Sequence, residues 1–184
     1  ISVTQAGSAG TVTVMGGTAE TDPGDGADTI TVDVDGGAAI YGNGGDDLIT
    51  WVGGVSAEIY GGGGADVFVF GAGAVFGAQP DFDLGEDNTI NDFASGEDQL
   101  DLSAFASAFT GQVDVSSAAD LAEALDIAAE ALAEGEVGWF AFGADAYVVA
   151  DVAGTDGATF DATEDQVIHL RDVASLSSGD FILA

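Results

Sequence analysis

The chain has 184 residues, 47% of them hydrophobic, which is enough for one domain with a buried core. It has 33 acidic residues and a single basic residue, Arg171, which gives a formal net charge of −32. The sequence therefore has no basic patch that could hold a nucleic acid. The sequence has no cysteine for disulfides or zinc–thiolate sites, and no apolar run long enough for a transmembrane helix. We expect a folded protein whose acidic side chains are neutralised by something bound.

Two short stretches near the N-terminus, Ile1 to Thr4 and Thr11 to Val14, alternate between apolar and polar residues. This alternation predicts β-strands. We expect the segment either to cap the structure that follows or to add as a strand to a neighbouring molecule. The N-terminus lacks the basic and hydrophobic regions of a secretory signal peptide.

A pattern rich in glycine and aspartate then occurs three times, in segments 23–30, 42–49 and 61–68, each 19 residues after the last. The aligned positions hold glycine (Gly26, Gly45, Gly64), aspartate (Asp28, Asp47, Asp66) and a large apolar residue (Ile30, Ile49, Phe68). Ile40 and Ile59 form a second apolar position with the same offset. Glycine turns and short strands at a fixed period predict a solenoid of two stacked parallel sheets, with each apolar position forming a column in its core.

The three aspartates of the repeat should lie above one another on one side of the solenoid, about 4.8 Å apart. Carboxylates this close repel unless a cation lies between them, and glycine turns direct carbonyl oxygens into the same space. A flexible, all-oxygen cage favours Ca²⁺ over Mg²⁺ or Zn²⁺. Three loops enclose two gaps, so we predict about two ions, with Asp47 contributing to both. The predicted ligand residues of the repeat are Gly24, Gly26, Asp28, Gly42, Gly45, Asp47, Gly61, Gly64 and Asp66.

These blocks resemble the RTX family, whose nonapeptide is G-G-x-G-x-D-x-U-x with U apolar. The resemblance covers roughly residues 16–75 and implies a calcium-loaded parallel β-roll, with ions held between successive loops on one side. The chain departs from the pattern in three ways. The period is one residue longer than two nonapeptides, Pro23 replaces the first glycine, and Ala38 and Ala57 stand where the opposite side would have aspartates. We therefore expect no metal on that opposite side.

The acidic stretch from Asp81 to Phe105 resembles the segment that closes the roll in RTX proteases and related secreted proteins. Asp92 and Asp98 match its pattern and are further candidate calcium ligands, whereas Asn88 replaces its first aspartate. The alternative interpretation of this stretch is a solvated acidic turn.

A helix is predicted after Ser117, which would be its N-cap, and Gly135 would end it. Its apolar face should pack on the end of the roll or on a sheet. Its other face is acidic, and a partner-binding helix is the alternative. The apolar face consists of Leu121, Leu125, Ala128 and Leu132, and the acidic face of Glu123, Asp126, Glu130 and Glu134.

Beyond the helix, segment 138–151 predicts two strands joined by a Gly-Ala-Asp turn, segment 154–165 a loop, and segment 166–173 another strand. Trp139, Phe140, Phe142 and Tyr147 are assigned to the core. The region from Phe140 to the apolar C-terminus resembles the targeting regions of RTX proteins exported by type I secretion, and looks closest to RTX S-layer and surface proteins. The resemblance implies an uncleaved C-terminal export signal.

Catalysis is not expected. His169 is the only histidine, and we predict that it is an exposed strand residue rather than part of a triad. The sequence contains neither an H-E-x-x-H zinc helix nor a phosphate-binding loop.

We predict a mainly β fold, with N-terminal strands and an RTX β-roll in residues 1–75. A roll-closing segment, one α-helix and a small β-rich region with the secretion signal follow in residues 76–184. The predicted function is a secreted, Ca²⁺-binding structural protein of an S-layer or extracellular matrix, which self-associates through calcium and uses the type I secretion apparatus. The alternative is the calcium-dependent carrier module of a larger secreted enzyme or adhesin.

Overall fold

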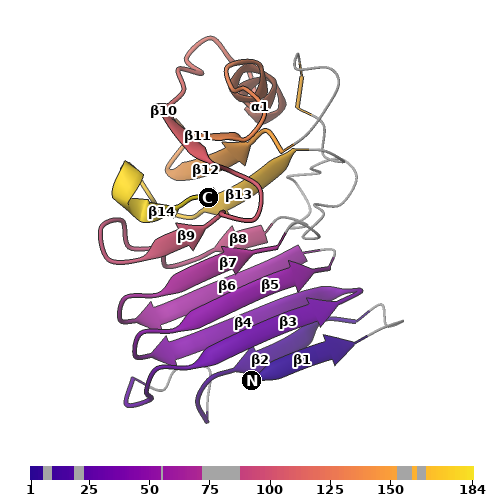
Figure 1. Cartoon of the computed structure of the whole chain (residues 1–184), viewed down its shortest axis with the longest axis vertical. Helices are drawn as coiled ribbons and strands as arrows, with labels where there is room; N and C mark the ends of the chain where they lie inside the picture. The colour runs from indigo at the N-terminus through magenta and orange to yellow at the C-terminus, as the bar shows by residue number, and fades with distance from the viewer. Residues whose placement is uncertain (6–9, 19–22, 55, 72–87, 153–158, 161–164) are drawn as a thin grey trace.

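The computed structural model describes residues 1–5, 10–18, 23–54, 56–71, 88–152, 159–160 and 165–184 (Figure 1). Two sheets lie face to face and wind together as a roll. Sheet A consists, in spatial order, of β1 (Ser2–Gln5), β3 (Thr29–Val34), β5 (Leu48–Gly53), β7 (Val67–Phe70), β9 (Gln99–Asp101) and β14 (Phe181–Ile182). Sheet B consists, in spatial order, of β10 (Ala108–Gln112), β11 (Glu136–Phe142), β12 (Asp145–Ala150), β13 (Gln166–Leu170), β8 (Asn88–Ile90), β6 (Ser56–Gly63), β4 (Gly37–Gly44) and β2 (Val12–Met15).

Strand pairing follows the 19-residue period. In sheet A, Ile49 lies between Ile30 and Phe68, and in sheet B Ile40 lies opposite Ile59, all in parallel register. The predicted core columns are therefore confirmed. Each column is longer than predicted, because Leu100 continues the first, and Val14 and Ile90 continue the second. All of these side chains are at most 4% exposed. The fold is mainly β, and the strands of the repeat form the predicted pair of stacked parallel sheets.

The two N-terminal strands extend the roll of their own chain. β1 pairs with β3 and β2 pairs with β4, both in parallel. The segment therefore pairs with its own roll, and its addition to a neighbouring molecule stays a prediction. In the described part of the chain, no strand pairs with the outer edge of β1 or of β2.

Strands from beyond residue 75 continue both sheets. β8 pairs with β6, β9 pairs with β7, and the C-terminal β14 pairs with β9. The boundary placed at residue 75 stays a prediction. Residues 72–87, which include the start of the predicted roll-closing segment, and most of the predicted loop 154–165 lie outside the described residues.

The helix α1 (Leu121–Glu130) is shorter than predicted and begins at a different cap. Its N-cap is Asp120, whose side chain accepts a hydrogen bond from the Glu123 amide at 3.0 Å, and the Glu123 carboxylate accepts one from the Ala119 amide at 2.7 Å. The helix therefore begins at Asp120, and the assignment of Ser117 as N-cap was wrong. The helix also ends before Gly135, with Ala131 as its C-cap.

The predicted faces of the helix are confirmed. Leu125 and Ala128 are buried, whereas Glu123, Asp126 and Glu130 are exposed. The helix packs on β11 and β12, at the end of sheet B that lies away from the N-terminal strands (Figure 1). Among the described residues, no helix is long and apolar enough to cross a membrane.

The predicted hairpin is present as β11 and β12, which pair antiparallel. Trp139, Phe140 and Tyr147 are buried, and Phe142 is partly buried against the core. Two further tyrosines, Tyr41 and Tyr60, lie opposite each other on neighbouring strands, and their rings stack with centroids 4.8 Å apart.

His169 lies in a strand, β13, but its predicted exposure was wrong, because its side chain is only 12% exposed. Its ring stacks on Tyr147 at a centroid distance of 4.8 Å. One ring nitrogen, Nε2, lies 2.9 Å from Asp145 Oδ2, and the other, Nδ1, lies 3.2 Å from Thr89 Oγ1. These contacts join β8, β12 and β13, so the histidine is a structural link within sheet B.

Candidate metal centre

Four aspartates, Asp28, Asp47, Asp66 and Asp98, follow one another along one side of the roll, and we call them the aspartate column. The carboxylates of the last three each link two successive coils through the same kind of hydrogen bond. Asp47 Oδ1 accepts from the Asp28 amide at 2.7 Å, Asp66 Oδ1 from the Asp47 amide at 2.9 Å, and Asp98 Oδ1 from the Asp66 amide at 2.9 Å. The repeat placed the first three in a column, and the fourth extends it.

The second oxygen of the two central aspartates has no hydrogen-bond partner. Asp47 and Asp66 are 2% and 1% exposed, and the Oδ2 atom of each is buried and unpaired. An unpaired buried carboxylate oxygen is costly, because water is lost and nothing replaces it. Burial accordingly raises the pKa of Asp66 from 3.8 to about 6, and the neighbouring Asp98 and Asp47 charges add to the effect. Burial likewise raises the pKa of Asp47.

These unpaired oxygens point at two glycines that have no space for a side chain. A Cβ on Gly42 would lie 2.2 Å from Asp47 Oδ2 and 2.5 Å from the Gly61 carbonyl oxygen. A Cβ on Gly61 would lie 2.2 Å from Asp66 Oδ2. The absence of a side chain at Gly42 therefore lets a carboxylate oxygen and a main-chain carbonyl oxygen converge on one place, and its absence at Gly61 leaves room for Asp66 Oδ2 beside the Phe68 ring.

The loop glycines Gly45 and Gly64 serve a different purpose. Their φ angles are 104° and 136°, and residues other than glycine rarely adopt such values. A Cβ on Gly64 would also lie 2.3 Å from the carbonyl oxygen of Gly45. Glycine at this position thus allows successive loops to stack in direct backbone contact.

In the first coil, the structure places the glycine contact elsewhere than predicted. A Cβ on Gly16 would lie 2.7 Å from Asp28 Oδ2 and 2.5 Å from the Gly42 carbonyl oxygen, so Gly16 takes the position expected in segment 23–30. Gly24 lies in an exposed turn. Gly26 is exposed, and its amide donates to Asp25 Oδ1 at 3.0 Å.

The two predicted ligands beyond the repeat have different surroundings. Asp98 belongs to the column, and its Oδ2 accepts from the Ala94 amide at 2.8 Å. Asp92 does not belong to it, since its two oxygens accept from the Gly61 and Gly62 amides, each at 3.0 Å. Burial raises the pKa of both carboxyl groups. The ligand role of Asp92 stays a prediction, and in this arrangement its oxygens cap the end of β6.

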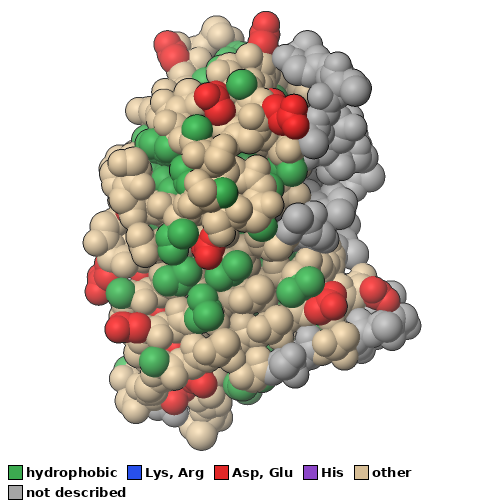
Figure 2. Space-filling model, in the orientation of Figure 1, with side chains coloured by type: hydrophobic (Ala, Val, Ile, Leu, Met, Phe, Trp, Pro, Cys, Tyr) green, Lys and Arg blue, Asp and Glu red, His purple; other side chains and the backbone are tan. Residues whose placement is uncertain are grey.

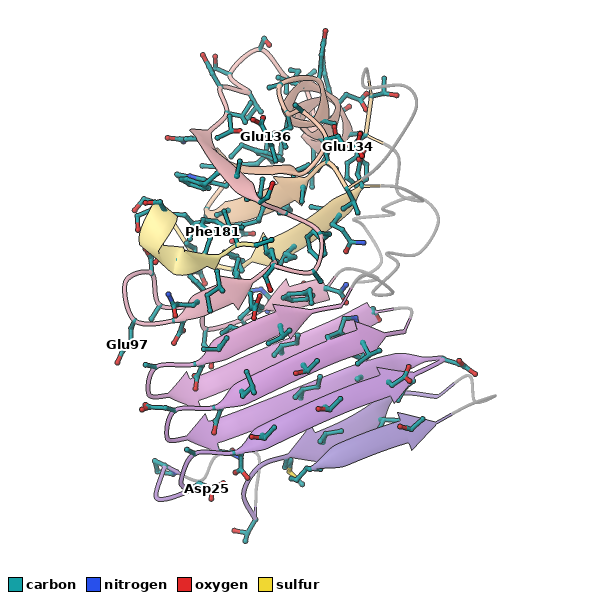
Figure 3. All side chains as sticks on the ribbon, in the orientation of Figure 1. Asp25, Glu97, Glu134, Glu136 and Phe181 are labelled. Carbon is teal, nitrogen blue, oxygen red and sulfur yellow. The ribbon has the colours of Figure 1, made fainter. Side chains whose placement is uncertain are left out.

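Two further acidic residues in the loops were missed in the sequence. Asp25 has a buried, unpaired Oδ2 atom, and Asp46 Oδ1 accepts from the Ala65 amide at 3.0 Å. Both stand at positions where the other blocks have glycine or alanine, so the alignment gave no signal for them. Figure 3 shows Asp25 and Glu97 on the same side of the molecule, in loops at the two ends of the column.

The carboxylate and carbonyl oxygens of the column suit a hard cation, which prefers oxygen ligands. In the described part of the chain, no group of three or more His, Cys, Asp or Glu side chains could hold a metal by itself. A cation in the column would therefore need main-chain carbonyl oxygens, such as those of Gly42 and Gly61, beside the carboxylates. Four carboxylates enclose three gaps, one more than the three blocks of the repeat predict. The face drawn in Figure 2 shows acidic side chains and no lysine or arginine side chain that could neutralise them in place of a metal cation.

Comparison with known proteins agrees with this geometry. The family model described as Peptidase M10 serralysin C terminal matches residues 24–130, from the first glycine loop to the end of α1. No curated protein matches the chain. Because the match spans more than half of the sequence, the chain belongs to the peptidase M10 serralysin C-terminal family, an RTX-associated family of β-roll type.

Proposed function

We propose that this chain is a calcium-binding module of a secreted RTX protein and that it folds on meeting Ca²⁺ outside the cell. The observation that carries the proposal is the pair of buried, unpaired Oδ2 atoms on Asp47 and Asp66. Each lies against a glycine that has no space for a side chain, and at Gly42 the Gly61 carbonyl oxygen converges on the same place as Asp47 Oδ2. Ca²⁺ accepts about six to eight oxygen ligands in flexible geometry, so it suits stacked loops of this kind.

In this proposal the chain needs Ca²⁺ to fold, because of its large negative charge. A net charge of −32 opposes compaction, and the column brings four of these charges together. Ca²⁺ neutralises them only when the coils are stacked, so its binding free energy becomes folding free energy. The chain stays unfolded where calcium is scarce, as in the cytosol, and can thread a type I secretion channel before it folds outside.

The module serves, in this proposal, as the carrier and secretion part of a larger protein and catalyses no reaction itself. The support is the description of the family, which is a C-terminal part of serralysin peptidases. The partner in export is the type I secretion apparatus, which would recognise the C-terminal region.

A second candidate is a structural role in an S-layer or extracellular matrix, in which the chain self-associates through calcium. One observation favours it: the outer edges of β1 and β2 have no strand partner among the described residues. Open edges of this kind can accept a strand of another molecule, and divalent ions would lower the repulsion between two such acidic molecules.

Calcium titration of the full chain tests both candidates. We expect an unfolded far-UV circular dichroism spectrum in excess chelator and a β-rich one in millimolar Ca²⁺, with little response to Mg²⁺ at equal concentration. A spectrum that chelator leaves unchanged would refute calcium-coupled folding. Light scattering on the same samples separates the candidates, because a structural layer protein must grow into large assemblies with calcium, whereas a carrier module stays monomeric.

A further inference from the structure

A buried aspartate outside the aspartate column fastens the C-terminal end of the chain to the roll. Asp180 is 0% exposed and lies in the short helix η1 (Ser178–Asp180), directly before β14. Its carboxylate accepts from Ser95 Oγ at 2.9 Å and from the Gly96 amide at 2.7 Å. It also accepts from the amide and the hydroxyl of Ser177, at 2.6 and 3.1 Å. Four donors thus meet one carboxylate, from segments more than 80 residues apart.

The loop that Asp180 holds is the one that ends the column. We call residues 91–98 the closing loop. On the side facing the roll, Asp92 binds the end of β6, and Asp98 binds the Asp66 amide. The opposite side of the loop presents Ser95 and Gly96, and both donate to Asp180.

The remaining contacts of the C-terminal segment keep Asp180 in place. β14 pairs with β9, with Phe181 opposite Leu100. The Gln99 side chain donates to the Gly179 carbonyl oxygen at 2.9 Å, and the Leu102 amide donates to the Ile182 carbonyl oxygen at 3.0 Å. Burial by itself would raise the pKa of Asp180, but its hydrogen bonds outweigh burial and lower it, so the group is a charged, strong acceptor.

We propose that Asp180 is a positioning residue for the last gap of the column. By holding Ser95 and Gly96 it fixes the closing loop, and the closing loop in turn fixes Asp98 opposite Asp66. The inference rests on the proposed calcium-binding function. Groups that orient metal ligands without touching the metal typically change metal affinity by about 10–100-fold. The C-terminal segment therefore sets the affinity of one calcium site, the one between Asp66 and Asp98.

The test compares Asp180→Asn with Asp114→Asn in the full chain by calorimetric Ca²⁺ titration. Circular dichroism at the end of each titration checks that the calcium-loaded variant is folded. Asp114 is an exposed aspartate that accepts from the Ser116 amide in its own loop, so its variant loses the same charge without touching the column. We expect Asp180→Asn to weaken one class of sites by about tenfold and to leave the others unchanged. Asp114→Asn should resemble the wild type.

A double-mutant cycle identifies the affected site. In an Asp98→Asn background, Asp180→Asn should cause no further loss, because both changes act on the same gap. If Asp180→Asn fails to fold, Ser95→Ala removes one donor and should weaken the same site by a smaller factor.

Unchanged affinities in the Asp180 variant would overturn the inference, and so would an equal weakening of all sites, which indicates general destabilisation. These outcomes leave the proposed function intact as long as the wild type binds calcium. A wild-type chain that binds no calcium would refute both the proposed function and the inference about Asp180.

Discussion

Adding one methyl group at Gly61 tests whether the space beside the aspartate column is needed. The Cβ of alanine there would lie 2.2 Å from Asp66 Oδ2 and 2.9 Å from the Phe68 ring. The carboxylate must then swing away and lose its bond from the Asp47 amide. Gly63, two residues on in the same strand, is the matched control, because a Cβ there meets nothing within 4 Å.

The two substitutions should act in opposite directions. Overpacking costs about 1–3 kcal/mol, and loss of a hydrogen bond to a charged group costs about 1.5–3 kcal/mol. Gly61→Ala should therefore destabilise the fold by about 2.5–6 kcal/mol. Gly63→Ala narrows the unfolded ensemble without a clash, so it should be neutral or stabilising by up to about 1 kcal/mol.

Urea denaturation in millimolar Ca²⁺, followed by circular dichroism, measures both free energies of unfolding. The calcium concentration at the midpoint of folding gives a second readout, and it should rise for Gly61→Ala alone. Equal stabilities and equal calcium midpoints for the two variants would show that the space beside Asp66 is not needed, and would refute the argument from the glycine contacts.

Three other outcomes are expected. Asp47→Ala should raise the calcium midpoint of folding more than Asp28→Ala, because Asp47 lies between two coils and Asp28 begins the column; equal midpoints would count against this order. Phe68→Ala should lower the free energy of unfolding by about 3–5 kcal/mol, as measured with urea, whereas the outward, partly exposed Val69 should tolerate alanine far better. In calcium-free buffer, lowering the pH from 7.5 to 5 should shift the wild type toward the folded state, measured as a gain of far-UV β signal. The raised pKa of Asp66, about 6, makes protonation favour the folded state, and this contribution is lost as the pH rises through 6. Asp66→Asn should flatten that pH profile, and a wild-type β signal that increases from pH 5 to pH 7.5 would contradict the reasoning.

The features that the sequence predicted are those with a fixed interval. Asp47 and Asp66 are 19 residues apart, and so are Ile40 and Ile59, and each pair lies on neighbouring coils as the repeat requires. A constant period gives a constant register, because every coil uses the same number of residues to return to the same sheet.

The features that the sequence missed are those where the interval changes. Asp98 was named as a candidate ligand through a resemblance, but its place in the column was not predicted, because it follows Asp66 by 32 residues. Asp180 lies 84 residues from the Gly96 amide that it binds, so no periodic pattern could connect this pair either. Gly16 takes a place that the block alignment gave to segment 23–30, since the first loop is longer than the others.

The other two differences have separate causes, one local and one in the folded sheet. The Asp120 side chain accepts from the Glu123 amide and the Glu123 carboxylate accepts from the Ala119 amide, so the helix begins at Asp120 and not at the serine expected from the sequence. His169 was expected to be exposed because its neighbours from β8 and β12 become neighbours only in the folded sheet.

The stacked tyrosines of the roll provide an optical measure of register. Tyr41 and Tyr60 lie face to face at an interplanar angle of 7° only because their coils are offset by one full period. A slip of one residue would turn one of the rings to the opposite face of the sheet and separate the pair. Two aromatic rings this close should couple electronically, so the near-ultraviolet circular dichroism of the pair would distinguish a roll in register from a compact but misaligned one. The far-ultraviolet spectrum, which reports only strand content, would show the two as alike.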